Sequence, residues 1–175
     1  KSQCPVDSIP YMECFINPGY CYIDNFWVDG NIISSNSLYS GNDSSYQSFS
    51  TPYIMLQQGA LHYLDFEGTA SGTYAISVWV DTDNSGTFDN DEMLISAYDF
   101  GGSSFLGTSM VLPIDAVADT VKLRVMKTHN GFSGDPNEAC GSFSYYQGEA
   151  EDYYAIIQCS FPELPSYRLP IRIPP

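Results

Sequence analysis

Short apolar runs with a two-residue period constrain the fold of this chain more than any other feature. In the run TYAISVWV, residues 73–80, successive side chains fall on opposite faces, which is the period of a β-strand and not of a helix. The run VKLRVM, residues 121–126, has the same period. It predicts a strand with three buried aliphatic side chains, Val121, Leu123 and Val125, and two exposed basic ones, Lys122 and Arg124. Both runs therefore predict sheet.

Further candidate strands occur along the chain. They span residues 21–28, 61–68, 92–98, 109–114 and 152–159. Clusters of Gly, Ser, Asn and Pro separate them, and residues 113–120 would form at most one helical turn. The Ser-rich segment 34–51 has no core periodicity and predicts a long surface loop. The expected architecture is all-β, an antiparallel β-sandwich of the jelly-roll or immunoglobulin-like kind.

Composition excludes several classes of partner. The length of 175 residues and the hydrophobic content of 43% suffice for one globular domain. The 21 acidic residues against 6 basic ones give a net charge of -15, which repels phosphate backbones and anionic membranes and attracts cations. No apolar run is long enough to span a bilayer, and the opening KSQCPV is typical of a secreted chain after signal removal. We therefore expect a secreted protein, extracellular or at the cell surface, with no nucleic-acid partner and no membrane insertion.

The cysteines agree with an oxidising compartment. There are five of them: Cys4, Cys14, Cys21, Cys140 and Cys159. None shows the CxxC spacing of a zinc site, so disulfides are the favoured interpretation and buried free thiols the alternative. A bridge from the N-terminal part to Cys140 would close a loop of about 120 residues, and loop-closure entropy assigns about 4 to 5 kcal/mol to that scale. Five is odd, so one thiol stays free, pairs with another chain or is buried, and the sequence leaves the pairing open.

An acidic loop follows the first of the apolar runs. The segment DTDNSGTFDNDE, residues 81–92, carries five carboxylates in twelve positions and matches the EF-hand calcium pattern, with Gly86 at the sharp turn. The predicted ligands are Asp81, Asp83, Ser85, the carbonyl of Thr87, Asp89 and Glu92. A calcium ion needs six to eight oxygens at about 2.4 Å, which alternate residues of a turning loop can supply. The loop therefore predicts an EF-hand-like Ca2+ site on a β scaffold; the alternative is a solvated acidic hairpin loop.

A second acidic cluster, GEAEDYY, occupies residues 148–154. On a strand, Glu149 and Glu151 would face one side and Asp152 the other. Here the chain resembles the GEVED domain, a β-sandwich module of secreted bacterial proteins. The residues that carry the resemblance are Trp79, Asp81, Cys140, Glu149, Glu151, Asp152 and Tyr153, with Ala150 in place of the usual Val.

The resemblance implies a role for the two glutamates. It suggests that Glu149 or Glu151 approaches the Asp81 loop and completes the coordination of the ion. The alternative is that these carboxylates pair with Arg124 or Lys122 on a neighbouring strand.

The last residues form a separate segment. The resemblance ends before SFPELPSYRLPIRIPP, so the expected organisation is a GEVED-like domain at 1–159 and an extended Pro-rich tail at 160–175. Five of the sixteen tail residues are proline, which suits an extended, edge-lying segment. Arg168 and Arg172 could meet the acidic body of the same or a neighbouring copy. The alternative is a plain linker.

Three classes of function remain. The first is a secreted calcium-binding structural or adhesion module that could self-assemble into a fibre through its tail. The second is a carbohydrate- or protein-binding accessory module of a secreted hydrolase. Aromatic residues of the segment 130–147 could stack on sugar rings; the alternative, which we favour, is that they pack the mouth of the sandwich. An enzyme ranks last, because His62 and His129 lie in no catalytic motif.

Overall fold

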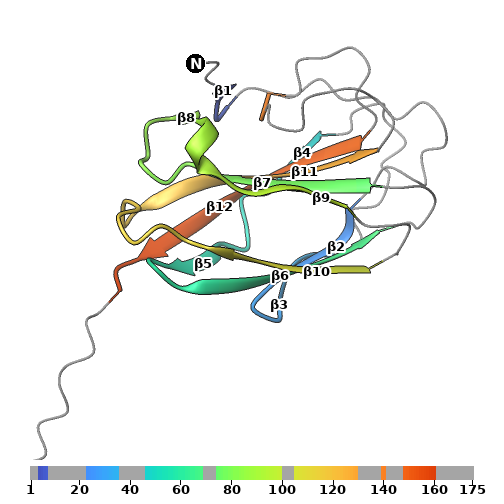
Figure 1. Ribbon diagram of the computed structural model, residues 1–175, viewed down its shortest axis with the longest axis horizontal. Coiled ribbons are helices and arrows are strands. Elements are labelled where there is room, and N and C mark those ends of the chain that lie inside the picture. Colours follow the sequence, from blue (N-terminus) through green and yellow to red (C-terminus); the bar gives the residue numbers. More distant parts are fainter. Residues whose placement is uncertain are drawn as a thin grey trace, which may run out of the picture.

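Two β-sheets face each other across a shared apolar core (Figure 1). The computed structural model describes residues 4–7, 23–35, 46–68, 74–99, 105–129, 139–140 and 148–160. Across these ranges the only helical element is a single 3-10 turn, η2 (Asn90–Glu92), and no helix is long and apolar enough to cross a membrane. The all-β prediction is confirmed.

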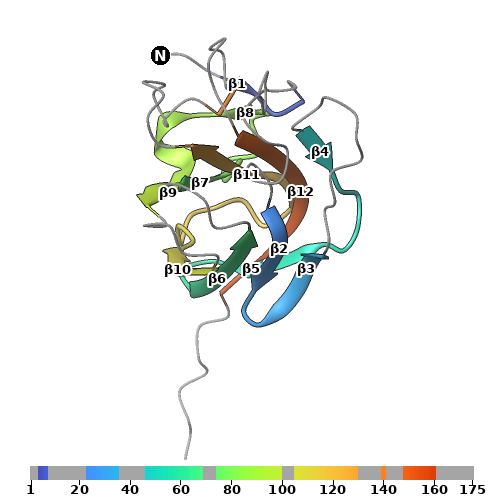
Figure 2. The same ribbon diagram turned by 90° about the vertical axis from the view of Figure 1, so that its right-hand side faces the viewer.

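The four-stranded sheet is antiparallel throughout and has the order β10–β6–β2–β3. Its strands are β2 (Ile23–Val28), β3 (Asn31–Ser35), β6 (Leu61–Gly68) and β10 (Phe105–Val111). β6 has the bounds that the sequence predicted, and its alternate residues His62, Leu64 and Phe66 are buried. One face of this sheet therefore lines the core, and the other points away from it (Figure 2).

The larger sheet contains six strands. It has the order β4–β12–β11–β7–β9, and β5 also pairs with β12. Its strands are β4 (Tyr46–Ser48), β5 (Ile54–Gln57), β7 (Tyr74–Val80), β9 (Met93–Asp99), β11 (Thr120–His129) and β12 (Gly148–Gln158).

Two features of this sheet correct the sequence analysis. β4 and β5 run parallel to β12, so the sandwich is mixed and not purely antiparallel. Parallel pairing needs a long connection, and here most of the chain separates the paired strands. The segment 34–51 is not one loop, because it contains the end of β3 and all of β4; residues 36–45 lie outside the described ranges.

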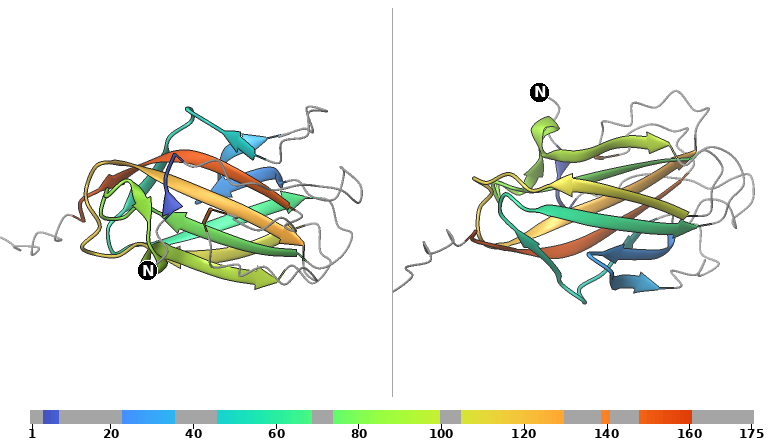
Figure 3. Two further views of the ribbon diagram at one scale, coloured as in Figure 1. Left: turned by 90° about the horizontal axis from the view of Figure 1, so that it is seen from above. Right: turned by 60° about the horizontal axis from the view of Figure 1, so that its bottom comes forward.

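The six-stranded sheet is covered on both faces. Its inner face contributes Ile76, Val78 and Val80 to the central core. Its outer face carries Trp79, which packs in a second apolar cluster with the short two-stranded sheet of β1 (Cys4–Pro5) and β8 (Thr87–Phe88). Figure 3, left, shows β1 and β8 lying over this face. The predicted alternation is therefore confirmed for residues 76–80, with both faces buried.

The outer cover explains one wrong prediction. Arg124 was expected to be exposed, but its side chain has no solvent-accessible surface. It lies on the outer face of β11, beneath Phe88 of β8 and close to Cys4 of β1. A period of two distinguishes the faces of a strand but does not report whether the second face is covered.

A disulfide joins the N-terminal segment to the domain. Cys4 and Cys140 are bonded across a sequence separation of 136 residues. Cys159 is free and exposed. Cys14, Cys21 and tail residues 161–175 lie outside the described ranges.

Candidate metal centre

The acidic loop connects β7 to β9 at one end of the six-stranded sheet. Its first residue, Asp81, donates its backbone N–H to the Lys122 carbonyl of β11, at 3.0 Å. The connection between β10 and β11 holds the loop from the other side. There the Val117 N–H donates to the Thr82 carbonyl at 2.7 Å, and the Asn84 amide donates to Asp119 at 3.2 Å. Both attachments fix the start of the loop.

The turn that follows depends on a glycine. Gly86 has a φ of +81°, a left-handed conformation that strains other residues, so the sequence-based role of Gly86 is confirmed. The turn brings the N–H groups of Ser85 and Gly86 to the two carboxylate oxygens of Asp81, at 2.9 and 3.1 Å. Asp81 therefore occupies the centre of the loop, with its side chain directed inward.

Glu92 closes the loop from its far end. Its Oε1 accepts hydrogen bonds from the backbone N–H groups of Thr82 and Asp83, at 2.6 and 3.3 Å. Its Oε2 accepts from the Asp89 N–H at 2.9 Å. The side chain thus returns to the residues where the loop began.

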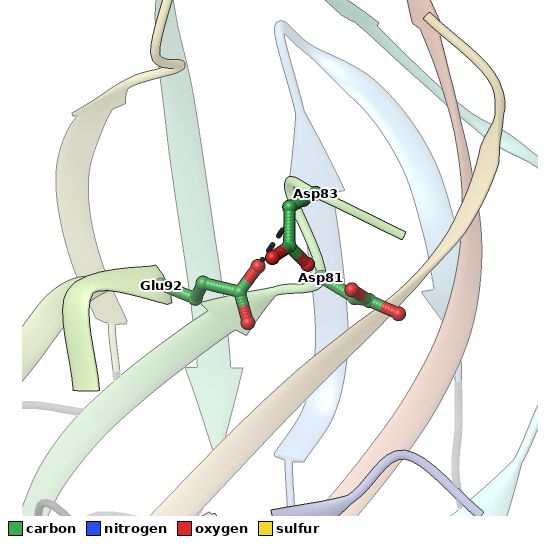
Figure 4. Close-up of side chains that lie close together, drawn as sticks. All are labelled: Asp81, Asp83 and Glu92. Atoms are coloured by element: carbon green, nitrogen blue, oxygen red, sulfur yellow. Dashed lines mark hydrogen bonds between the residues drawn. The ribbon is translucent and has the colours of Figure 1, made fainter. Parts of the chain in front are cut away.

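These contacts bring three carboxylates together. One oxygen from each of Asp81, Asp83 and Glu92 lies within 4.8 Å of the others (Figure 4). Two ligands on opposite sides of one calcium ion are separated by about 4.8 Å, which is twice the usual Ca–O distance. Asp81 and Glu92 are buried and Asp83 is exposed, so the cluster is reachable from solvent on one side. The spacing and the oxygen donors fit a single hard cation.

Burial makes these carboxylates costly to ionise without a counter-charge. The pKa of Asp81 is raised chiefly by burial, against hydrogen bonds from Gly86 and Ser85, and the nearby Asp83 raises it further. The pKa of Glu92 is also raised by burial, against its backbone donors. A bound cation would favour the ionised form of all three groups.

The other three predicted ligands are Ser85, Thr87 and Asp89, and the Ser85 N–H donates to the carboxylates of both Asp81 and Asp83. The Ser85 hydroxyl donates to the Thr87 carbonyl at 3.2 Å, so these two predicted ligands bond to each other. Asp89 lines a cavity of about 230 Å³ together with Asp83 and Glu92. Sequence reasoning missed two further carboxylates of that cavity, Asp91 and Asp115. Asp91 belongs to the predicted loop itself. Asp115 lies outside the loop in the sequence, and only the tertiary structure brings it to the cavity.

Glu149 and Glu151 do not lie at the acidic loop. Glu149 pairs with Lys127 across β11 and β12, whereas Asp81 adjoins Lys122, five residues away on β11. At about 3.3 Å per strand residue, Glu149 lies about 17 Å along the strand from this end, and Glu151, which pairs with Val125, lies about 10 Å from it. The contact suggested by the family resemblance is therefore not formed, because the register of β12 places both glutamates away from the loop end of β11.

The two glutamates belong to a buried polar cluster between the sheets. Glu149 accepts hydrogen bonds from the Ile23 N–H at 2.6 Å and from the Gln47 amide at 3.1 Å. The Tyr153 hydroxyl lies 2.5 Å from a Glu151 oxygen and 2.9 Å from the Ser34 hydroxyl. Glu149 and Glu151 share one face of β12, as predicted. This cluster ties β12 to both β2 and β3 of the opposite sheet.

One lysine complements the charge of this cluster. Lys127 is buried, and its burial lowers its pKa to about 8 although Asp24, Glu149 and Glu151 oppose the shift. Burial and repulsion by Glu151 raise the pKa of Glu149 well above its usual range. Sequence reasoning named Arg124 and Lys122 as alternative partners and missed Lys127. The alternation of the run that begins at Val121 gave the signal, because it places residue 127 on the inner face.

The alternative pairing holds for the third carboxylate of the motif. Asp152 lies on the outer face of β12 and forms a salt bridge with Arg124 at 2.6 Å. The opposite orientation of Asp152 and the glutamates is therefore confirmed, and each side has its own cationic partner.

One comparison with known proteins found a match, and it is to a domain family. Searches of the curated proteins and of the solved structures found no match to this chain. The family model of the GEVED domain matches residues 75–156, which include the acidic loop, β11 and the Glu149–Asp152 motif. Residues 75–156 of this chain therefore match the GEVED domain family.

Proposed function

We propose that the loop 81–92 binds one calcium ion and that this protein is a secreted, calcium-binding structural or adhesion module. The observation that carries the proposal is the convergence of Asp81, Asp83 and Glu92 within 4.8 Å. Carboxylate, hydroxyl and carbonyl oxygens are the ligands of hard cations. The Cys4–Cys140 disulfide supports an oxidising, extracellular location.

The role of the ion would be mechanical. The loop that holds it also pairs with the N-terminal segment, since the Val6 N–H donates to the Gly86 carbonyl at 3.1 Å and Pro5 lies opposite Thr87. An ion bound by Asp81, Asp83 and Glu92 would therefore fix β7, η2 and the disulfide-linked segment to one another. The ion would replace repulsion between buried carboxylates by attraction.

Calorimetric titration and thermal unfolding test this function. Calcium should bind with one site per chain, and a chelator should lower the Tm, because an ion that binds only the folded state stabilises it by mass action. The variant Asp81→Asn should lose most of this difference. Glu67→Gln, which removes a carboxylate from the opposite sheet, is the matched control and should keep it. Equal melting curves of the wild type with and without chelator would contradict the proposal.

The proposal extends to self-assembly. The tail, residues 160–175, would dock on a neighbouring copy, where Arg168 and Arg172 would meet an acidic surface. Supporting this is the net charge of -15, which leaves few basic side chains in the body of the protein. Light scattering and electron microscopy in calcium test it, and a chain that stays monomeric at high concentration would refute assembly.

A carbohydrate-binding accessory module is the second candidate. Tyr63 and Phe105 favour it, because their rings are 60% and 53% exposed and could stack on sugars. The aromatic residues of 130–147 named in the sequence analysis lie outside the described ranges. Binding on a glycan array would support this candidate.

We propose no catalytic role. The His62 Nδ1 lies 2.7 Å from an Asp29 carboxylate oxygen, and its Nε2 accepts from the Gln57 N–H at 3.0 Å. Both ring nitrogens of this buried histidine are thus used in structural contacts. The His129 side chain lies outside the described part of the chain. A turnover screen for glycosidase and peptidase activity tests this assignment.

A further inference from the structure

The outer face of the four-stranded sheet exposes large apolar side chains. Figure 3, right, shows β10, β6, β2 and β3 side by side, and the strand pairings place the exposed residues in adjacent rows. The most exposed are Ile32 (53%), Leu61 (49%), Tyr63 (60%), Phe105 (53%) and Val111 (59%). The half-buried ring of Trp27 lies 6.4 Å from the Phe105 ring. Such a set on one face marks an interaction surface and not scattered exposure.

Acidic groups lie among these rings. Asp65 of β6 lies between Trp27 of β2 and Gly107 of β10. Gly107 has no side chain and so leaves room for the carboxylate of the half-buried Asp65; a Cβ there would lie 3.0 Å from Asp65 Oδ1. Glu67, next on the same face of β6, accepts a hydrogen bond from the Asn25 amide at 2.7 Å. We call Trp27, Tyr63, Asp65, Glu67 and Phe105 the acceptor face.

No cation in the described part of the chain belongs to this sheet. The three basic residues within the described ranges, Lys122, Arg124 and Lys127, all lie on β11 of the other sheet. Of the remaining three in the sequence, two are Arg168 and Arg172 of the tail. The acidic face and the basic tail are therefore complementary in charge.

The tail also complements the rings. Segments rich in proline favour the polyproline II conformation, which is ordered before binding and docks on aromatic surfaces at low entropic cost. Arginines between the prolines can bond to carboxylates with two parallel hydrogen bonds. The sequence RLPIRIPP supplies prolines, aliphatic side chains and two arginines in one short stretch.

We propose that the acceptor face binds the tail of a second copy of this chain. This inference rests on the self-assembly part of the proposed function and assigns its contact surface. The tail of sixteen residues spans about 50 Å as polyproline II, whereas the strand β6 is about 25 Å long. The tail is thus long enough to cross the whole face.

The direction of β12 favours a second copy over the same chain. β12 runs parallel to β5 and ends at the turn between β5 and β6, where the Gln58 N–H donates to the Gln158 carbonyl at 3.0 Å. β6 runs back from this turn. The chain therefore leaves the domain heading away from its own acceptor face, and docking there would require a reversal that a neighbouring face does not.

The tail and the acceptor face are different surfaces, so the contact is heterologous. Repeating it from copy to copy does not close a two-fold dimer but extends a row of molecules. This gives the contact a signature that can be tested by mixing variants of the full-length chain.

The experiment uses two charge-reversed proteins in calcium, measured by light scattering after gel filtration. The face variant carries Asp65→Lys and Glu67→Lys, and the tail variant carries Arg168→Glu and Arg172→Glu. Each alone should associate at least about tenfold more weakly than the wild type, whereas an equimolar mixture should assemble again with the two variants in alternation. In the mixture, the intact tail of the face variant occupies the intact face of the tail variant, and the reversed tail of the tail variant occupies the reversed face of the face variant. A chain with all four changes should assemble again.

Ring and fold controls accompany these proteins. Tyr63→Ser should weaken assembly, whereas Tyr53→Ser, at an exposed tyrosine of the other sheet, should not. Each variant should keep the calcium-dependent Tm of the wild type, which shows that it folds.

The outcomes separate the face from the assembly itself. If the wild type assembles and the face variant assembles equally well, the acceptor face is wrong while self-assembly stands. If the wild type stays monomeric, the proposed assembly fails and this inference with it. If the protein is a monomer that binds a glycan through Tyr63, the acceptor face binds a sugar and not the tail, which overturns the inference. A monomer whose Tyr63 signals shift in the tail variant would show docking within one chain, which also overturns the inference.

Discussion

Arg124 and Asp152 form a bidentate salt bridge that is buried in the protein. The guanidinium donates to both carboxylate oxygens, at 2.6 and 2.7 Å, and neither side chain is more than 1% exposed. The same guanidinium donates to the Ala139 carbonyl at 2.9 Å and to the Val6 carbonyl at 3.3 Å. The pair therefore connects β11 and β12 with both chain segments that the disulfide joins.

Removal of the carboxylate should be strongly destabilising. Asp152→Ala leaves the Arg124 charge buried without its partner, so we expect the free energy of unfolding to fall by about 3 to 5 kcal/mol. Urea denaturation measures it. The control is Asp7→Ala, whose carboxylate lies 3.9 Å from Lys122 at the surface and should cost less than about 1 kcal/mol. Equal losses of unfolding free energy for the two substitutions would show that the buried pair stabilises the protein no more than the surface pair does.

Gly86→Ala should weaken calcium binding. An alanine with a φ of +81° would be strained by about 1 to 2 kcal/mol. The strain would shift the backbone N–H of residue 86, which donates a hydrogen bond to the Asp81 carboxylate. Gly30 has a similar φ of +75° between β2 and β3, far from the loop, and Gly30→Ala is therefore the matched control. Both should lower stability, but only Gly86→Ala should lower calcium affinity in calorimetric titration. Unchanged affinity would exclude this turn from the metal site.

Glu149→Gln should stabilise the protein increasingly as the pH rises. Burial and the nearby Glu151 raise the pKa of Glu149 in the folded protein. The stability that comes from protonated Glu149 is therefore fully present below the pKa of the unfolded chain, and it is lost as the pH rises through the pKa of the folded protein. Glutamine removes that loss and can still accept from Ile23. Thermal unfolding from about pH 4 to about pH 8 compares the two proteins. A Tm difference that does not change with pH would contradict the raised pKa.

Loss of the disulfide should lower stability without abolishing the sandwich. The bond between Cys4 and Cys140 closes a loop across 136 residues, for which loop-closure entropy gives about 5 kcal/mol. We expect a decrease of that order for Cys4→Ser with Cys140→Ser in urea denaturation. Cys159→Ser, at the free exposed thiol, is the control and should have little effect. A double variant as stable as the wild type would show that Arg124 alone retains the N-terminal segment.

Local patterns predicted the features that depend on neighbouring residues. The apolar run at residues 61–68 predicted the bounds of β6. Its alternate residues His62, Leu64 and Phe66 form the buried face, since successive side chains of a strand point to opposite faces. The left-handed turn at Gly86 was equally local. The same reasoning failed for Arg124, because its burial depends on Phe88 and Cys4, which are distant in sequence.

The sequence by itself determined the all-β class, the acidic loop with its turn, and the opposite orientation of Glu149 and Asp152 on one strand. Each of these follows from steric and periodic rules within a few residues. Only the tertiary structure decided that Glu149 meets Lys127 instead of the acidic loop, and that β1 and β8 cover Arg124. Strand register joins Lys127 to Glu149 on different strands, and the cover of the outer face is joined to the domain by the bond from Cys4 to Cys140, across 136 residues. No pattern within a few residues encodes such pairings.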